Sequence, residues 1–181
     1  MSDIIWNEIR EELQNGAKDP SHPFHFFTFA TIGLERTPRL RTVVLRKVTE
    51  ELNLIFYTDQ RSKKVLHINE NNRVSMLFYD QERLLQLKIE GLAKVRSNAG
   101  TLKMHWATVP SKNRRDYTKT RAPGSTIAKP EGVEYLKDKN YFCLVEVEPF
   151  KIEYLKIQTP DHLRIRFSRA DESWKSDFLV P

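Results

Sequence analysis

RVSMLFYDQERLLQLKIEGLAKV, residues 73–95, is the stretch that decides the fold. Two runs rich in aliphatic and aromatic residues, 73–79 and 84–95, flank the polar turn DQER. The pattern predicts two β-strands joined by a short turn. Because no helical crossover separates the two runs, the strands must be antiparallel.

Strand-like runs continue on both sides of this pair. Three precede it, at residues 25–33, 40–48 and 52–58. The last two are separated by TEE, which is hairpin spacing. The remaining strand-like runs lie near the C-terminus and read YFCLVEVEPFKIEYLKI, HLRIRFSR and SWKSDFLVP. We therefore expect at least six strands.

Helical patterns are few and short. In residues 2–16, Ile5, Ile9 and Leu13 recur at four-residue spacing behind Ser2 as N-cap, and Gly16 is expected to end the helix. Two further helices are predicted over 62–71, with Val65, Leu66 and Ile68 near one face, and over 98–109. Strands and helices do not alternate, so the sequence predicts a mainly β fold with flanking helices, an antiparallel barrel or sandwich. With no repeat or linker, residues 1–181 are expected to form a single domain.

Bulk composition narrows the class of protein. The chain has 181 residues, 39% of them hydrophobic, and no apolar run long enough to cross a bilayer. It shows no secretory signal pattern, and its single cysteine, Cys143, cannot form an internal disulfide. These features predict a soluble protein of a reducing, cytoplasmic compartment. The net charge of +6 favours an anionic partner, which leaves a phosphorylated cofactor, an acidic substrate and nucleic acid open.

Several common site motifs are absent. Neither GxGxxG nor GxxxxGK[ST] occurs, so the two usual phosphate loops are not available, and no GxSxG indicates a serine hydrolase. His22 and His25 are interrupted by Pro23, and no other ligand cluster follows, so no metal site is predicted.

Cations instead gather at strand and helix starts. Arg41 and Arg46 lie five residues apart on one predicted strand, which places them on opposite faces. Lys63 and Lys64 occupy the first helical turn after Ser62, where they oppose the helix dipole unless an anion binds. The alternative interpretation is that Lys63 and Lys64 are solvent-exposed charges at a turn and bind no anion. Gln86 interrupts an apolar strand, and its amide either faces solvent or meets the polar edge of a flavin or nucleobase.

Six segments in register resemble the pyridoxamine 5'-phosphate oxidase family. They are RTVVLR (41–46), FYT (56–58), SKK (62–64), NRVSMLF (72–78), QLKIEG (86–91) and WKSDFLVP (174–181). The resemblance implies a six-stranded antiparallel Greek-key split β-barrel. It also implies a homodimer with FMN in clefts between the subunits and a small-molecule substrate.

The same resemblance assigns residues to the flavin site. Arg41, Lys63 and Lys64 would hold the FMN phosphate, Gln86 would meet the isoalloxazine edge, and Arg166 would contact the flavin. The complete set of implied cofactor-binding residues is Arg41, Thr42, Val43, Val44, Leu45, Arg46, Tyr57, Thr58, Ser62, Lys63, Lys64, Gln86 and Arg166.

The substrate side departs from the family pattern. Arg46 stands where the family has a phosphate-gripping lysine, and a Tyr-Arg-Ser set on a later helix aligns with His105, Val109 and Asn113. The family's Arg-Leu-His reads His162-Leu163-Arg164. The candidate substrate residues are therefore Arg46, His105, Asn113, His162 and Arg164. Residues 110–130, which carry three prolines and many cations, are expected to form a long functional or partner-facing loop.

Three functions follow from the sequence, in order of preference. The first is an FMN-dependent oxidoreductase of unidentified substrate, for which oxidation of vitamin B6 phosphates is doubtful. The second is a flavin-binding or redox-stress protein without turnover on the same fold. The third is a basic β-barrel that binds nucleic acid, with the positive net charge as its main support.

Overall fold

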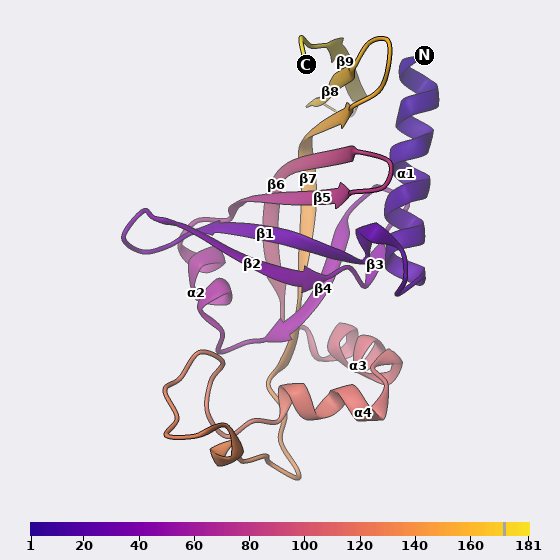
Figure 1. Ribbon diagram of the computed structural model, residues 1–181. Helices are drawn as coiled ribbons and strands as arrows, with labels where there is room; N and C mark the ends of the chain where they lie inside the picture. The colour runs from indigo at the N-terminus through magenta and orange to yellow at the C-terminus, as the bar shows by residue number, and fades with distance from the viewer. Residues whose placement is uncertain (172) are drawn as a thin grey trace.

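The computed structural model describes residues 1–171 and 173–181, and Figure 1 shows how they are arranged. The helices of this part of the chain are α1 (Ser2–Lys18), α2 (Lys63–Glu70), α3 (Ala99–Thr108) and α4 (Ser111–Arg114), with short 3-10 turns at Pro23–His25, Arg115–Tyr117 and Pro130–Gly132. The strands are β1 (Phe26–Ile32), β2 (Pro38–Val44), β3 (Lys47–Val48), β4 (Leu54–Asp59), β5 (Arg73–Asp80), β6 (Leu85–Arg96), β7 (Phe142–Lys156), β8 (Leu163–Ala170) and β9 (Ser173–Phe178).

All the described strands join one antiparallel sheet in the order β2-β1-β5-β6-β7-β4-β3, and β8 and β9 extend it from β7. The mainly β, antiparallel fold that the sequence predicts is confirmed. The strand β7 is central, because its first half pairs with β4 and its second half with β8, while β6 pairs along most of its length. In Figure 1, β7 runs from the side of α3 to the β8–β9 hairpin.

The sheet curls at an irregularity between β6 and β7. Their register shifts between Glu90 and Gly91, which increases the local twist of paired strands. A side chain at Gly91 would meet the carbonyl oxygen of Glu148 and the Cγ1 atom of Val147, each at 2.7 Å. Glycine at this position therefore lets β6 and β7 approach closely where the sheet bends.

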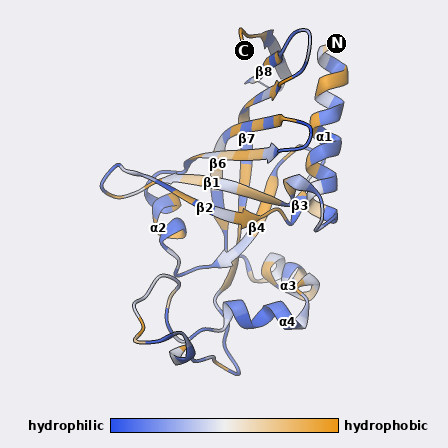
Figure 2. Ribbon diagram, in the orientation of Figure 1, coloured by the Kyte–Doolittle hydropathy of each residue, from blue (hydrophilic) through white to orange (hydrophobic). Residues whose placement is uncertain are grey.

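Aromatic residues fill the inside of the curl. Phe27 and Phe78 stack with ring centroids 4.7 Å apart, and Phe29 meets Phe56 edge-on at 4.8 Å. These side chains are at most 2% exposed, so the inward positions of β1, β4 and β5 form one core. Figure 2 shows hydrophobic colour along these strands and hydrophilic colour over α4.

Helix α1 covers one side of this core. Ile5, Ile9 and Leu13 are buried, as their spacing predicts. The helix passes Gly16 and ends at Lys18, so the prediction that Gly16 ends it is wrong. A Cβ at Gly16 would lie 2.8 Å from the carbonyl oxygen of Phe24. Gly16 is thus needed for close contact with the following segment, and the helix ends later.

The predicted strand over 40–48 is divided in the structure. Strand β2 ends at Val44, and the amide of Leu45 then donates to the carbonyl of His25. The next amide, of Arg46, donates to Ile55 of β4. Because the Leu45 side chain is fully buried, the chain turns inward here and changes strand partner. Arg46 therefore does not share a strand with Arg41, contrary to the sequence-based prediction.

Two other predicted segments also differ in detail. In α2, which Ser62 precedes as N-cap, Val65 and Ile68 are buried as expected, but Leu66 is 48% exposed and His67 is buried in its place. The segment predicted as a long loop, residues 110–130, begins with α4 and a 3-10 turn, and it continues to a β-bridge between Lys119 and Tyr135.

Candidate functional site

Three cations from β2 and the start of α2 meet beside β1. Arg41 Nη1 donates to Thr31 Oγ1 at 2.8 Å and to the Phe29 carbonyl at 3.3 Å. Lys64 Nζ donates to Thr58 Oγ1 at 2.9 Å. Arg41 and Lys63 line one cleft of about 540 Å³. We call Arg41, Lys63 and Lys64 the anion cluster.

Positive charge is in excess at the anion cluster, although Glu35 lines the same cleft and the charge of Asp59 partly offsets the lowering of the Lys64 pKa. Burial, and next the nearby charge of Arg41, lower the pKa of Lys64. Among the described residues, none of the three cations forms an ion pair with a carboxylate. Converging cations without an acidic partner favour an anion.

The start of α2 adds backbone donors to the same place. The amides of Lys63 and Lys64 lie in the first helical turn, where no carbonyl of the helix itself can accept from them. Ser62 precedes them, and its hydroxyl lies 3.3 Å from Thr58 Oγ1 rather than capping the helix. Amides and lysines together suit a phosphate at this helix start.

A second group lies around Tyr57 on β4. The Tyr57 hydroxyl is 2.9 Å from His105 Nδ1 of α3, and the Arg46 guanidinium lies 5.8 Å from the centroid of the Tyr57 ring. Burial, and next Lys47, lower the pKa of His105. A cleft of about 250 Å³ is lined by Ala17, Arg46, Tyr57, Thr108, Val109 and Pro110. Arg46 and His105 are therefore brought together through Tyr57.

Gln86 lies on the outer face of the sheet. It pairs with Tyr79 on β5 and Leu155 on β7, and directly paired residues of neighbouring strands project to the same face. Tyr79 is 51% exposed, which identifies that face as the outer one. On β2, Val44 pairs with Phe26, which is 56% exposed, so Val44 also faces outward.

The C-terminal candidates are not brought to the anion cluster within one chain. Arg164 and Arg166 lie on β8, and β1, β5, β6 and β7 separate that strand from β2. Arg164 pairs with Glu153 at 2.9 Å, and Arg166 pairs with Asp177 at 2.8 Å. His162 Nδ1 lies within hydrogen-bond distance of both backbone polar atoms of Gln158.

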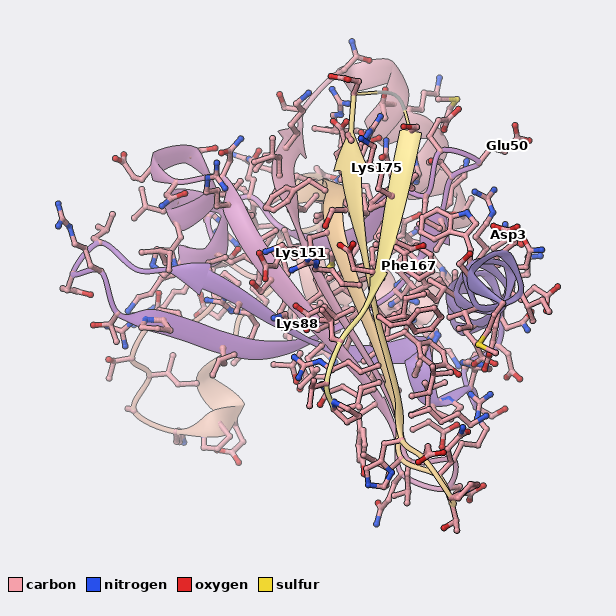
Figure 3. The ribbon with its side chains drawn as sticks, turned by 90° about the horizontal axis from the view of Figure 1, so that it is seen from above. Asp3, Glu50, Lys88, Lys151, Phe167 and Lys175 are labelled. Atoms are coloured by element: carbon pink, nitrogen blue, oxygen red, sulfur yellow. The ribbon has the colours of Figure 1, made fainter. Side chains whose placement is uncertain are left out.

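Figure 3 shows the two faces of the sheet from above. Lys88 and Lys151 lie on the face away from α1, and Phe167 lies on the α1 side, where its ring packs 4.9 Å from Trp6. Lys88 and Lys151 both approach Glu90, at 3.4 and 3.0 Å. The charges in the middle of the outer face are therefore balanced, in contrast to the anion cluster.

The remaining candidates lie near α3 and α4. Asn113 is half-buried in α4, but the neighbouring Arg114 is engaged with the protein itself. Its guanidinium donates to the carbonyls of Val109 and Trp106 and lies 5.2 Å from a ring centroid of Trp106. Among residues 1–171 and 173–181, no three metal-ligating side chains form a group that could hold a metal ion, and no helix is long and apolar enough to span a membrane.

Sequence reasoning missed Thr31 and His67, which stand behind the anion cluster. The Thr31 hydroxyl accepts from Arg41 and lies 3.0 Å from His67 Nδ1. Thr31 follows Phe27 and Phe29 at alternate positions of β1, so it is a polar residue at a core position. A polar residue at a core position of a strand indicates a buried hydrogen bond, and this pattern could have identified Thr31 from the sequence. His67 follows Lys63 by one helical turn.

A further missed residue is Arg61, directly before α2. Its guanidinium makes two bonds to the carboxylate of Asp59, at 2.7 and 3.0 Å. It also donates to the carbonyls of Lys119 and Thr120, at 2.8 and 3.0 Å, and lies 3.3 Å from the ring centroid of Tyr141. Arg61 thereby ties the segment around residue 120 to the loop that carries the anion cluster.

Comparison with known proteins places this geometry in a family. The model of the family described as pyridoxamine 5'-phosphate oxidase, FMN-binding domain, matches residues 5–97. A pyridoxine/pyridoxamine 5'-phosphate oxidase 2 of Arabidopsis thaliana is 28% identical over 180 residues, which cover 89% of this chain and 90% of that protein. A pyridoxine/pyridoxamine 5'-phosphate oxidase of Flavobacterium johnsoniae is 41% identical over 70 residues, 39% of this chain and 32% of that protein. The chain thus spans about a third of the length of that relative.

Solved structures share the fold. An FMN-binding protein of Nostoc punctiforme, described as pyridoxamine 5'-phosphate oxidase-related, superposes with a TM-score of 0.80 at 21% identity, covering 97% of this chain and 96% of that one. PhzG of Burkholderia lata, solved in complex with tetrahydrophenazine-1-carboxylic acid, gives 0.77 at 19% identity, with 99% and 92% covered. Since the family model spans more than half of the sequence, the chain belongs to the pyridoxamine 5'-phosphate oxidase family of FMN-binding domains.

Proposed function

We propose that this protein, acting as a single domain, binds FMN through the anion cluster and is an FMN-dependent oxidoreductase. The observation that carries the proposal is the convergence of Arg41, Lys63 and Lys64 without a carboxylate partner among the described residues. A phosphate supplies the missing negative charge. Each charge-assisted hydrogen bond to it contributes about 1.5–3 kcal/mol.

The donor set fits the parts of FMN. Arg41, Lys63 and Lys64, with the first-turn amides of α2 and Ser62, hold the phosphate. Residues 42–44 and 46, together with Tyr57 and Thr58, line the ribityl chain and ring. Leu45 is fully buried and its amide donates to the His25 carbonyl, so this residue supports the site without contacting the ligand, contrary to the sequence-based expectation. Gln86 lies on the outer face, whereas Arg41 pairs with the buried Phe29 and faces the core side, so Gln86 does not meet the same flavin within one chain. The flavin, when bound, supplies the electron transfer.

A second copy of the chain completes the site in this proposal. Among the exposed apolar side chains of the outer face are Phe26, Leu77 and Tyr79, at 56, 37 and 51% exposure. Gln86 and Arg166 lie on the same outer face, and other strands separate both of them from β2, so neither serves the flavin of Arg41 within one chain. In a homodimer that pairs these faces, the partner's Gln86 meets the polar edge of the isoalloxazine and the partner's Arg166 reaches the flavin. The exposed apolar side chains of the outer face then become buried in the dimer interface.

The substrate is a small molecule other than a vitamin B6 phosphate. A phosphate requires several free donors, and the candidate residues are engaged elsewhere. His105 binds the Tyr57 hydroxyl, Arg164 pairs with Glu153, and Arg114, which follows Asn113, bonds to backbone carbonyls. Arg46 forms no ion pair among the described residues and remains the candidate anchor for a substrate anion.

Absorption and binding measurements test the cofactor assignment. The purified protein should be yellow, or should take up added FMN with quenching of flavin fluorescence, and chemical reduction should bleach it. A colourless protein that does not quench FMN at micromolar concentration would overturn the proposal. FMN binding without turnover of a panel of reductants and oxidants would support the non-catalytic flavin-binding alternative. Pyridoxamine and pyridoxine 5'-phosphates should not be oxidised.

Sedimentation tests the homodimer. The wild-type protein should sediment as a dimer, and the double variant Phe26→Lys/Tyr79→Lys should sediment as a monomer with weakened FMN binding. Ile4→Lys is the matched control, because Ile4 is an exposed apolar residue on α1, away from the outer face. If the double variant stays dimeric with unchanged affinity, the two subunits do not meet through this face.

A further inference from the structure

A chain of buried polar atoms stands behind Arg41. From β2, Arg41 Nη1 donates to Thr31 Oγ1 at 2.8 Å, and from β1 the same oxygen lies 3.0 Å from His67 Nδ1 on α2. Thr31 is 1% exposed and His67 is 6% exposed. Three elements that are distant in sequence are therefore linked through one hydroxyl group.

The donor inventory fixes the direction of the hydrogen bond from Arg41, and the direction of the second bond depends on the tautomer of His67. A guanidinium only donates, so Thr31 Oγ1 accepts from Arg41. The hydroxyl hydrogen of Thr31 is then free to be donated to His67 Nδ1. His67 accepts it as a neutral imidazole with its proton on Nε2. Its surroundings favour the neutral form, because burial and then Arg41, Arg39 and Lys63 lower the pKa of His67, while Glu35 alone among the nearby charges raises it.

Arg41 needs such support because no carboxylate orients it. Apart from Thr31, its guanidinium has one longer bond, to the Phe29 carbonyl at 3.3 Å. An arginine that is free to move loses side-chain freedom when it grips a ligand, and this weakens binding. A guanidinium already held in place avoids that loss.

We propose that Thr31 and His67 are positioning residues that hold Arg41 ready for the phosphate of its ligand. His67 orients the Thr31 hydroxyl, and Thr31 orients the guanidinium. The inference rests on the proposed function, since it concerns the phosphate that Arg41 would bind. His67 also lines the cleft of Arg41 and Lys63 but is only 6% exposed, and Thr31 is 1% exposed. In this account the effect of both residues on binding passes through Arg41.

The alternative is that the pair only packs α2 against β1. A packing role affects the stability of the fold, and its effect on ligand binding does not depend on Arg41. Coupling to Arg41 therefore separates the two roles, and a double-mutant cycle measures that coupling.

The experiment measures the Kd of FMN by fluorescence quenching for matched variants of the full chain. Thr31→Val removes the hydroxyl and keeps the shape, whereas Thr31→Ser keeps the hydroxyl. His67→Leu removes the acceptor, and His67→Asn keeps an acceptor at the position of Nδ1. We expect Thr31→Val and His67→Leu to weaken binding about three- to tenfold, and Thr31→Ser and His67→Asn to remain within about twofold of wild type.

The cycle is closed in the Arg41→Ala background. There, Thr31→Val and His67→Leu should weaken FMN binding no further. Equal weakening with and without Arg41, or none in either background, overturns the inference while leaving the proposed function intact. If the wild type does not bind FMN, or Arg41→Ala binds as tightly as wild type, the phosphate assignment fails and the inference with it. Thermal denaturation monitors folding, and the His67 variants carry the test if Thr31→Val does not fold.

Discussion

Two charged clusters in this molecule are built in opposite ways. In the anion cluster, Arg41, Lys63 and Lys64 converge, and their hydrogen bonds go to uncharged oxygens. At the turn between β5 and β6, Arg83 makes two hydrogen bonds to Glu12 of α1, at 2.6 and 2.5 Å, and a third to Asp80. We call Arg83, Glu12 and Asp80 the ion-pair cluster.

The presence or absence of a carboxylate partner distinguishes a cation that stabilises the fold from a cation that is suited to bind a ligand. In the ion-pair cluster, hydrogen bonding to Glu12 is the main cause that raises the pKa of Arg83, so its charge is stabilised by the protein. In the anion cluster, burial and Arg41 lower the pKa of Lys64, so its charge is disfavoured by the protein. Substitutions in the first cluster should change stability, and those in the second should change ligand binding.

The largest expected effect is on FMN binding. Arg41→Ala removes a charge-assisted donor and should weaken FMN binding roughly ten- to hundredfold, measured by fluorescence quenching. The free energy of unfolding of the apoprotein should change little, because no carboxylate loses a partner. Arg83→Ala is the control and should bind FMN like the wild type. If Arg41→Ala and Arg83→Ala weakened FMN binding to the same extent, the two clusters would not differ in function.

Arg83→Ala should act on stability instead. It leaves the carboxylate of Asp80, whose residue is 3% exposed, without its side-chain partner. The expected loss is about 1–2 kcal/mol in the free energy of unfolding, measured with urea. Arg83→Lys should recover part of it, because a lysine restores charge but not the two-pronged contact with Glu12. An unchanged urea midpoint for Arg83→Ala would show that the ion-pair cluster contributes nothing.

The same cluster predicts an acid limit. Burial alone would raise the pKa of Asp80, but hydrogen bonds from the Arg83 side chain and backbone outweigh it, so the pKa lies below the ordinary 3.8. A carboxyl with a depressed pKa stabilises the fold above about 3.8, and that contribution is lost as the pH falls through its folded value. Without Arg83 the burial effect remains, so Arg83→Ala should lose stability at higher pH than wild type. Denaturation midpoints between pH 3 and 6 measure this, and parallel profiles would contradict it.

Features that depend on local pattern could be predicted from the sequence. The β5–β6 pair follows from the alternation around DQER, and α2 follows from Ser62 and the spacing of Val65 and Ile68. The division between β2 and β3 could not be predicted in this way. It depends on Leu45 turning into a core whose other walls come from distant strands.

Whether a cation is paired is also a matter of tertiary structure. Arg83 and Glu12 are 71 residues apart, so nothing near Arg83 indicates its main partner. The meeting of Thr31 with His67 depends on how α2 packs on β1. The resemblance in sequence could nominate Arg41, Lys63 and Lys64. Only the fold shows that none of them forms an ion pair with a described carboxylate and that two buried residues stand behind Arg41.

The smallest expected effect concerns Lys64 in the apoprotein. A lysine whose pKa is lowered by folding destabilises the fold below its folded pKa, and this penalty vanishes as the pH rises to its ordinary value of 10.5. Lys64→Met should therefore raise the free energy of unfolding at neutral pH by about 0.5–1 kcal/mol, and the gain should shrink as the pH approaches that value. The same variant should bind FMN more weakly. Lys88→Met is the matched control, because Lys88 lies near the carboxylates of Glu90 and Glu153 and should gain nothing. A less stable Lys64→Met apoprotein would mean that the fold itself uses this charge, and the contrast between the two clusters would then not hold for Lys64.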